Sequence, residues 1–419
     1  MNKLIVGPLR ESAISTVIVI DALDECKDGE PASAILSVLG QFVSQIPKVK
    51  FFLTSRPEPR VREGFRLPLL AKMTVVFVLH EVEPSQMDND IQLFFRHNLL
   101  ELAGHQGGLG DWPTKEHLDL LCEQAVGLFT YAVAALKFVG HGSSNPRMQL
   151  DYLLQSPESG AGERGTSFKG DTTLDQFYLS ILQQAFDRND LEDDPKLCSI
   201  LGAAILTTTP LSPSTIAILL GINIEVVISL LWLVRPLLVL QGDIDSPVLP
   251  FHKSFHDFII DPTRCTSKRF HISPLDHHPE LLVGCLKLMN QTLEKNMCKL
   301  PDAVSNSEVE DLEDRTKQYL NPALQYACKS WYKHLIDEDT AHRPVITSAL
   351  YYLLEKKFLF WLEVLSVLGA VREGIDALGV AVKWLEVCLV FILTVPPRFT
   401  KTGSRHHQLL TLSMTVSVS

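Results

Sequence analysis

The sequence predicts an α/β unit with a parallel sheet, followed by mostly α-helical domains. Within residues 1–83 a β-branched run, a helical pattern and a second apolar run follow one another, which is the order typical of a parallel sheet. From residue 84 onward the apolar residues recur at spacings of three and four, which indicates helices. Within residues 173–262 helical patterns are followed by two short apolar runs around a polar turn.

The first predicted strand is Thr16–Ile20, in which every residue is β-branched. Such a run is expected of a strand that is buried on both faces of a parallel sheet. A helix is predicted over residues 31–46, where apolar residues recur on one face. The second predicted strand is Val49–Leu53, and residues 74–79 form a third candidate.

Helical periodicity dominates the next part of the chain. Residues 90–102 and 115–139 are predicted to form two helices, and residues 174–186 form another. Residues 156–172 are rich in Gly, Ser and charged residues. They are therefore predicted to be an exposed loop.

Residues 196–262 are predicted to form a small unit of their own. Ser212 and Pro213 have the cap-and-start pattern of a helix N-terminus, and Gly221 is placed to end that helix. Helices followed by a β-hairpin are typical of a winged helix. The other segments expected here, two helices and two strands, are 196–206, 225–233, 237–241 and 248–252.

The predicted organisation therefore has six parts. They are an α/β core (1–83), a helical domain (84–155), the exposed loop (156–172), a linking helix with the winged helix (173–262), a second helical domain (263–396) and a disordered tail (397–419). The late apolar runs 358–370 and 387–395 fall short of the roughly 20 residues that a bilayer span needs. We expect them to be core helices of a soluble protein.

Composition limits the classes of function. Hydrophobic residues make up 46% of the chain, which excludes wholesale disorder. The net charge of −11 argues against a generic nucleic-acid binder, whose affinity depends on Lys and Arg. The eight cysteines form no Cys-x-x-Cys pair, which favours reduced thiols and a cytoplasmic location. The Cys and His residues between 265 and 298 fit none of the usual paired zinc-ligand spacings.

The strongest chemical signal follows the first strand. Asp21 stands directly after it, and Asp24 and Glu25 come next. A carboxylate at the end of a rigid strand can hold Mg²⁺ through its water shell, and a further acidic group can orient an attacking water. Asp21 is therefore the candidate metal residue, and Asp24 and Glu25 are the candidate catalytic residues. The alternative is a carboxylate that caps a strand–helix turn.

A second signal follows the second strand, where Thr54, Ser55 and Arg56 are located. Ligands of open parallel sheets bind at the carboxyl ends of the strands. Arg56 is therefore a candidate sensor of a γ-phosphate, with Thr54 and Ser55 near it. The alternative is a lone surface arginine before Pro57.

These two segments carry a family resemblance. IVIDALDEC (18–26) followed by FFLTSRPEPR (51–60) resembles the Walker B and sensor-1 motifs of NACHT signal-transducing ATPases, of the fungal NLR-like and nephrocystin-like type. The resemblance covers about residues 3–395. It implies a partial P-loop NTPase sheet, with ATP or ADP and Mg²⁺ as the ligands of the intact family.

Two later segments resemble the same family more loosely. Residues 122–129 resemble the Gly-Leu-Pro segment on the adenine side, with Phe129 in place of Pro, which makes Gly127 a candidate nucleotide contact. Residues 251–258 resemble the Met-His-Asp segment of the winged helix. The resemblance assigns His252 to the β-phosphate of ADP in a closed state, although Lys253 replaces the usual Asp.

The sequence departs from the family in its phosphate-binding loop. No Gly-x-x-x-x-Gly-Lys-Ser/Thr motif occurs, and only fifteen residues precede Thr16. The segment 160–167 has the glycines but has Thr166 where the lysine belongs. We therefore expect a truncated gene product or a degenerate paralogue with negligible ATPase activity.

Three functions are weighed on this basis. The first is a truncated nucleotide-dependent signalling switch. The second is a non-catalytic interaction module, in which residues 263–396 bind further copies or full-length paralogues. The third, a DNA-binding winged helix, is disfavoured because residues 196–262 carry three Lys/Arg against five Asp/Glu. Protease or hydrolase chemistry has no nucleophile elbow or zinc motif to support it, and no membrane partner is expected.

Overall fold

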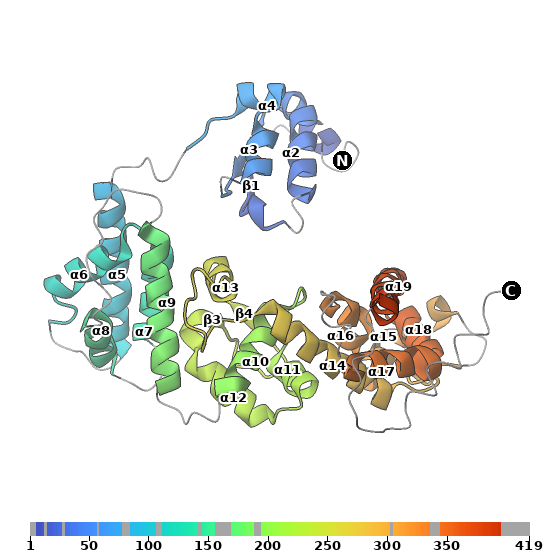
Figure 1. Cartoon of the computed structure of the whole chain (residues 1–419). Coiled ribbons are helices and arrows are strands. Elements are labelled where there is room, and N and C mark those ends of the chain that lie inside the picture. Colours follow the sequence, from blue (N-terminus) through green and yellow to red (C-terminus); the bar gives the residue numbers. More distant parts are fainter. Residues whose placement is uncertain are drawn as a thin grey trace. The chain divides into compact units, whose positions relative to one another are not determined.

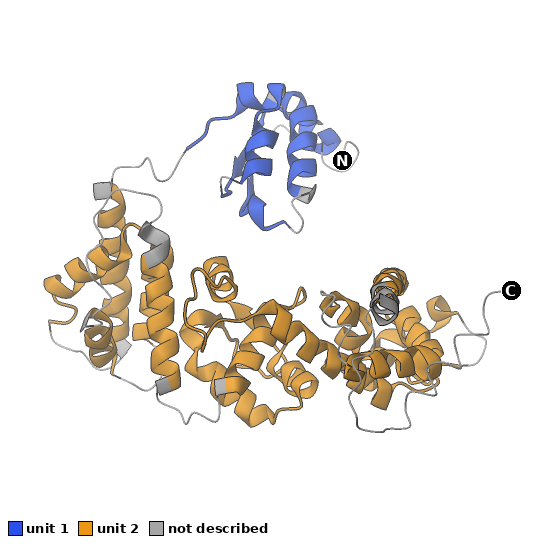
Figure 2. Ribbon diagram, viewed as in Figure 1, with its two compact units in different colours: residues 1–83 blue, residues 84–419 orange. Residues whose placement is uncertain are grey.

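The protein is mostly helical, with a small parallel two-stranded sheet near the N-terminus (Figure 1). It divides into two compact units, residues 1–83 and 84–419 (Figure 2), and each is described by itself. The residues that the computed structural model describes are 6–11, 15–26, 30–56, 58–77, 84–105, 111–140, 145–155, 169–187, 194–301, 305–335 and 344–394.

The sheet of the first unit consists of β1 (Thr16–Ile20) and β2 (Val49–Leu53), which lie parallel. Because Ile20 pairs with Leu53, both strands end at the same edge of the sheet. Both strands were predicted from the sequence, and the structure confirms them. The helices of this unit are α1 (Gly7–Glu11), η2 (Leu23–Glu25), α2 (Glu30–Phe42), η3 (Val43–Gln45), α3 (Pro59–Phe65) and α4 (Pro68–Met73).

Among the described residues of this unit, helices cover one face of the sheet. On that face Leu36 of α2 and Val61 of α3 are buried in one cluster with Leu23. Burial alternates along both strands, so that the opposite face exposes Val17, Val19 and Phe52. The expectation that the first strand is buried on both faces was therefore wrong for this unit.

The third predicted strand, at residues 74–79, is not formed in the part that the structure describes. Residues 74–77 follow α4 and have no strand pairing. A continuous apolar run needs a neighbouring strand and cover on both faces to be buried, whereas Val75, Val76 and Phe77 are largely exposed. Residues 78 and 79 lie outside the described residues.

The second unit begins with α5 (Pro84–His105), which packs on α6 (Lys115–Ala125) and α7 (Phe129–Val139). Residues 115–139 were predicted to be one helix, and this was wrong. Val126 and Gly127 have φ angles of 47° and 78°, a left-handed conformation that interrupts a right-handed helix.

The middle of this unit contains α8 (Pro146–Gln155), α9 (Lys169–Asp187) and α10 (Asp194–Ile205). Since α9 begins at Lys169, the last four residues of the predicted loop 156–172 are helical. The rest of that loop lies outside the described residues.

The predicted helix cap at Ser212 is confirmed. Ser212 Oγ accepts a hydrogen bond from the Thr215 amide at the start of α11 (Pro213–Leu220), and Gly221 ends the helix with a φ of 66°. The predicted hairpin forms, but its strands have only two residues each. The elements that follow α11 are α12 (Ile224–Leu233), η6 (Arg235–Leu237), β3 (Leu238–Val239) and the antiparallel β4 (Leu249–Pro250).

In the last part of the chain α14 (Pro274–Thr292) packs on α10, α11, α16 and α17. Across the described ranges no helix combines the length and apolar character needed to cross a membrane. The other elements of this part are α13 (Lys253–Ile260), η7 (Asn306–Glu308), α15 (Leu312–Tyr319), α16 (Pro322–Ser330), η8 (Trp331–His334), α17 (Pro344–Tyr352), η10 (Leu353–Lys357), α18 (Phe358–Val367) and α19 (Val371–Thr394).

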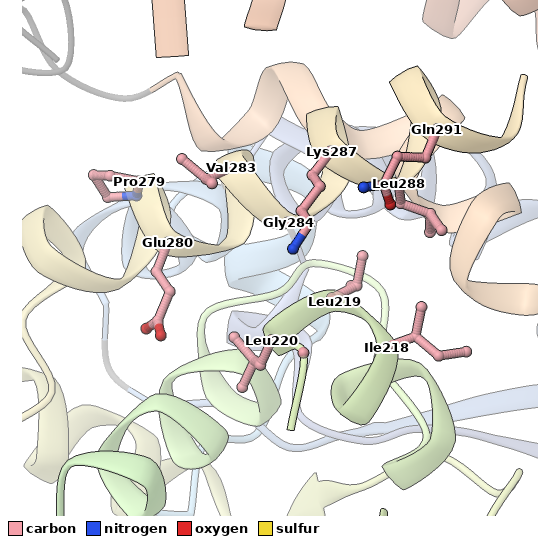
Figure 3. Close-up of a pocket in the computed structure, with 11 residues that line it drawn as sticks. Ile218, Leu219, Leu220, Pro279, Glu280, Val283, Gly284, Lys287, Leu288 and Gln291 are labelled. Atoms are coloured by element: carbon pink, nitrogen blue, oxygen red, sulfur yellow. The ribbon is translucent and has the colours of Figure 1, made fainter. Parts of the chain in front are cut away.

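The contact between α11 and α14 is unusually close at Gly284. A methyl group on this residue would overlap the carbonyl oxygen of Leu219. Beside this contact the two helices border a cleft of about 440 Å³ (Figure 3). Its lining combines apolar side chains such as Leu220 and Val283 with the charged Glu280 and Lys287.

Candidate functional site

The first pair of candidate residues, Asp21 and Thr54, stands directly after the two parallel strands. The Thr54 amide donates to Ile20 O at 3.0 Å, which continues the sheet by one residue. The Ala22 amide donates to Thr54 Oγ1 at 2.8 Å, and the Thr54 hydroxyl donates to Asp21 Oδ1. Thr54 therefore joins the ends of the two strands and orients the Asp21 carboxylate.

Asp24 lies in the short helix η2, and its side chain is only 3% exposed. Its Oδ1 accepts the Arg56 amide at 2.9 Å and the Ser55 hydroxyl at 3.3 Å, and its Oδ2 lies 3.7 Å from Arg56 Nε. Hydrogen bonds from a backbone amide to a carboxylate are charge-assisted and strong. Asp24 thus anchors the segment that follows β2 and holds Arg56 in place.

The open surface of this cluster is formed by other groups. Asp21 and Glu25 are exposed, and the Arg56 side chain is 43% exposed. Two carboxylates and a guanidinium group therefore border the same end of the sheet. A carboxylate oxygen suits a hard divalent cation, and a guanidinium group suits an anionic oxygen.

The fit to Mg²⁺ rests on how this ion is bound. Among the residues that the structure describes, no three His, Cys, Asp or Glu side chains converge as a metal site would require. Mg²⁺ usually keeps several waters and takes one or two carboxylates together with phosphate oxygens. The exposed Asp21 carboxylate fits that mode, whereas a site made of protein ligands alone does not.

Gly127 and His252 belong to the other compact unit, where each has a local structural role. Gly127 has a φ of 78°, so its backbone conformation favours glycine. His252 is the N-cap of α13, and its Nδ1 accepts the Ser254 amide at 3.1 Å.

Hydrogen bonds from Ser254 determine the tautomer of the neutral His252 ring. Because a backbone amide can only donate, Nδ1 of His252 carries no proton, and the ring proton of the neutral form lies on Nε2. The Ser254 hydroxyl, 2.7 Å from Nδ1, must then donate to it. Ser254 Oγ in turn accepts from the hydroxyl of the buried Tyr178, 2.8 Å away.

Sequence reasoning missed both Ser254 and Tyr178 as supporting residues. Tyr178 was assigned only to the apolar stripe of its helix, and its ring does pack there against Phe255 and Phe258. The hydroxyl group at the end of an otherwise apolar stripe was the available signal, because a buried tyrosine hydroxyl needs a hydrogen-bond partner.

Replacing Asp24 with alanine is expected to release the segment after β2. The Arg56 amide loses its acceptor, and the net cost of a hydrogen bond to a buried charged group is about 1.5–3 kcal/mol. Hydrogen exchange read by mass spectrometry or NMR should show at least tenfold faster exchange of the Arg56 amide. The exposed neighbour Glu25→Ala is the matched control and should leave this exchange unchanged. Equal exchange in Asp24→Ala and the native chain would contradict the anchoring role.

Comparison with known proteins relates this site to a family. Residues 2–56 match the family model described as Nephrocystin 3, N-terminal. That range contains both strands and all the candidate residues at their ends. Over these residues the chain is similar to that family.

A longer alignment extends the relationship beyond the sheet. The chain is 22% identical over 390 residues to the vegetative incompatibility protein HET-E-1 of Podospora anserina. The alignment covers 87% of this chain and 26% of HET-E-1, so the chain spans about a quarter of the length of this relative. No solved structure matches the chain. These findings place it in the context of NACHT and HET-E-type signalling proteins.

Proposed function

We propose that this chain forms the magnesium and sensor side of a NACHT-type nucleotide-dependent signalling switch. One observation carries the proposal. Asp21, Asp24 and Arg56 meet at the carboxyl end of two parallel neighbouring strands, which is where open parallel sheets bind their ligands. The same residues lie within the range that matches the nephrocystin-3 N-terminal family.

In this proposal each residue at the strand ends has a separate task. Asp21 holds Mg²⁺ through its water shell, and Thr54 keeps that carboxylate oriented by its hydrogen bond. Arg56 contacts the γ-phosphate, and Asp24 with Ser55 positions Arg56. Since Asp24 is buried and Glu25 is exposed, Glu25 is the carboxylate that is accessible to an attacking water.

For Gly127 and His252 of the second unit we propose the roles that the family resemblance implies, which are contacts with the adenine side of ADP and with its β-phosphate. Three helices followed by the β3–β4 hairpin support a winged helix there. The tautomer of His252 supports its proposed role, because a proton on Nε2 makes this atom a donor to a phosphate oxygen.

Nucleotide turnover by these 419 residues alone is expected to be negligible. A phosphate-binding loop supplies backbone amides and a lysine for the β- and γ-phosphates, and the sequence contains no such motif. The proposed switch therefore needs a phosphate-binding loop, and these residues do not contain that motif. The property that can be tested on these residues is weak binding of the metal ion and the γ-phosphate of a nucleotide.

Manganese–ATP is expected to bind weakly at the strand ends. A paramagnetic Mn²⁺ ion held by Asp21 should broaden the methyl signals of Ile20, Leu23 and Leu53 selectively, which methyl-detected NMR of the full chain can measure. The Asp21→Asn variant should lose the selective broadening, because the oxygen ligand becomes a neutral amide.

The matched control for the anion contact is Lys48→Ala, which removes an exposed cation near the opposite end of β2. It should retain the native broadening, whereas Arg56→Ala should reduce it for Mn²⁺–ATP but not for Mn²⁺ alone. Uniform broadening across the chain, or selective broadening that survives Asp21→Asn, would overturn the proposed site.

A second candidate function is a non-catalytic interaction module that pairs with further copies or with full-length NACHT paralogues. The observation that favours it is the number of apolar side chains exposed on the C-terminal helices, among them Val345, Leu359 and Ile375. Exposed apolar groups that gather on one face mark interaction surfaces.

A further inference from the structure

The helix α19 has two apolar faces, although only one of them packs into the protein. Ala377, Ala381 and Trp384 are 0%, 2% and 6% exposed and belong to the core. The second face carries Val371, Ile375 and Val382, which are 54%, 66% and 54% exposed. A helix that needs only one buried face would carry polar residues at these positions.

The exposed residues follow helical spacing. Val371, Ile375, Leu378 and Val382 are separated by four, three and four residues, so they form one stripe along the helix. Leu378, in the middle of this stripe, is half-buried. We call these four residues the α19 stripe. Alternating spacings of three and four are those of a seam between two packed helices.

The charges beside the α19 stripe lie on one flank only. With 3.6 residues per turn, Arg372, Asp376, Lys383 and Glu386 all lie on the same side of the stripe, and all four are exposed. On the opposite flank of the stripe, Ala381 is buried in the core. Along the chain the signs on the charged flank alternate: positive, negative, positive, negative.

This arrangement is complementary to itself when the helix meets a second copy in the antiparallel sense. In an antiparallel helix pair, equivalent flanks of the two helices face each other. With the two-fold axis between Leu378 and Gly379, Ile375 lies opposite Val382 of the other copy. Arg372 then lies within one residue of the position opposite Glu386, so that these opposite charges face each other twice, once on each side of the axis. Asp376 and Lys383 lie further round the helix from the stripe.

The parallel arrangement lacks this complementarity. Residues with the same number would then lie at the same height, and the charged flank of one helix would face the core flank of the other. The absence of a side chain at the exposed Gly379 also lets two backbones approach closely at the antiparallel crossing point.

We propose that two copies of this chain associate through the α19 stripe as an antiparallel, two-fold symmetric helix pair. A two-fold interface uses the same surface on both subunits, so that surface must be complementary to itself. The α19 stripe and the charges beside it meet this requirement. The inference rests on α19 alone and is independent of the proposed nucleotide site.

Sedimentation equilibrium of the full chain tests the association. The native chain should show a concentration-dependent monomer–dimer equilibrium, and the double variant Ile375→Glu with Val382→Glu should weaken it at least a hundredfold, leaving monomers. The matched control is Leu93→Glu on α5, which is 68% exposed and should leave the equilibrium unchanged. A native chain that stays monomeric up to the highest soluble concentration would overturn the proposal, as would a double variant that still dimerises.

Charge exchange tests the pairing of the flanks. Arg372→Glu alone and Glu386→Arg alone should each raise the dissociation constant about fivefold, since exposed ion pairs contribute little individually and this pair occurs twice in the dimer. The combined Arg372→Glu and Glu386→Arg variant should restore the native value. Additive weakening in the combined variant would contradict the proposed register.

Cysteine cross-linking tests the direction. Gly379→Cys should form a covalent dimer beyond that of the native chain, because the two copies of this position lie near the axis. Ile375→Cys should cross-link to Val382→Cys in a mixture, but not to itself. Efficient cross-linking of Ile375→Cys to itself, without the mixed product, would show a parallel pair and refute the antiparallel one.

Discussion

Replacing Gly284 with alanine is expected to destabilise the helical unit by about 1–2 kcal/mol. The new methyl group would overlap the carbonyl oxygen of Leu219 in α11. That oxygen belongs to the backbone, so it cannot turn aside as the end of a flexible side chain can. Overpacking of this kind costs about 1–3 kcal/mol. Alanine is favoured over glycine in a helix interior by up to about 1 kcal/mol, which offsets part of that cost.

The measurement is equilibrium unfolding in urea, followed by circular dichroism. Gly104→Ala is the matched control, because Gly104 also lies in a helix but has no atom within 4 Å of the position of a new Cβ. This control should be neutral or stabilised by up to about 1 kcal/mol. The same substitution should thus have opposite signs at the two sites. A Gly284→Ala variant as stable as the native chain would show that α11 and α14 can separate without cost.

The strand ends illustrate what the sequence could predict. A β-branched run ending in Asp21 and an apolar run ending in Thr54 predicted two parallel strands, and the pairing of Ile20 with Leu53 brings their ends together. The period of the apolar residues and the polarity at each end carry this information locally. The contact between Asp21 and Thr54 then follows from the register alone.

The role of Asp24 was harder to predict, because its partner is distant in the sequence. Asp24 and Glu25 are adjacent and both acidic. Because both follow the first strand closely, the sequence predicted a catalytic role for both without distinguishing them. The structure separates them: Asp24 is buried against the Arg56 amide, and Glu25 is exposed. Burial depends on where β2 lies relative to η2, and no pattern within the segment 21–25 encodes it.

The interruption after α6 shows a second limit. Val126 adopts a positive φ of 47°, a conformation that is strongly disfavoured for a β-branched residue. Local propensity therefore favoured one continuous helix through this position. The packing of α5 against both α6 and α7 is a tertiary contribution that overrides this preference, and single-residue propensities do not contain it.

The region around α14 contains a histidine pair, His278 and His334, of which only His278 lies in the stretch 265–298 that was weighed as a zinc site. His334 is 1% exposed, and its Nδ1 lies 2.7 Å from Nδ1 of His278. Its Nε2 lies 2.9 Å from the Tyr326 hydroxyl. Only one of the two facing Nδ1 atoms can carry the proton between them, so the pair cannot hold a positive charge on both rings. Burial, with His278 and Lys333 nearby, lowers the pKa of His334 to about 3.

Acid is therefore expected to destabilise the helical unit through His334. An unfolded histidine has a pKa of about 6.5, so between pH 6.5 and about 3 the unfolded chain binds more protons than the folded chain. The free energy of unfolding then falls as the pH is lowered through this window, and His334 contributes no pH dependence above it. The full contribution is about 3–5 kcal/mol, since each pKa unit corresponds to about 1.4 kcal/mol.

Urea unfolding at intervals between pH 7.5 and pH 4 measures this slope. The carboxylates of the chain also contribute below pH 5, so the informative quantity is the difference from a His334→Gln variant, which does not titrate. This variant should be less stable than the native chain at pH 7.5 but should lose less stability on acidification. His97→Gln, at an exposed position of α5, is the matched control and should keep the native slope. If His334→Gln also kept the native slope, the buried pair would not be the acid-sensitive element, because removing its titrating group would have left the proton linkage intact.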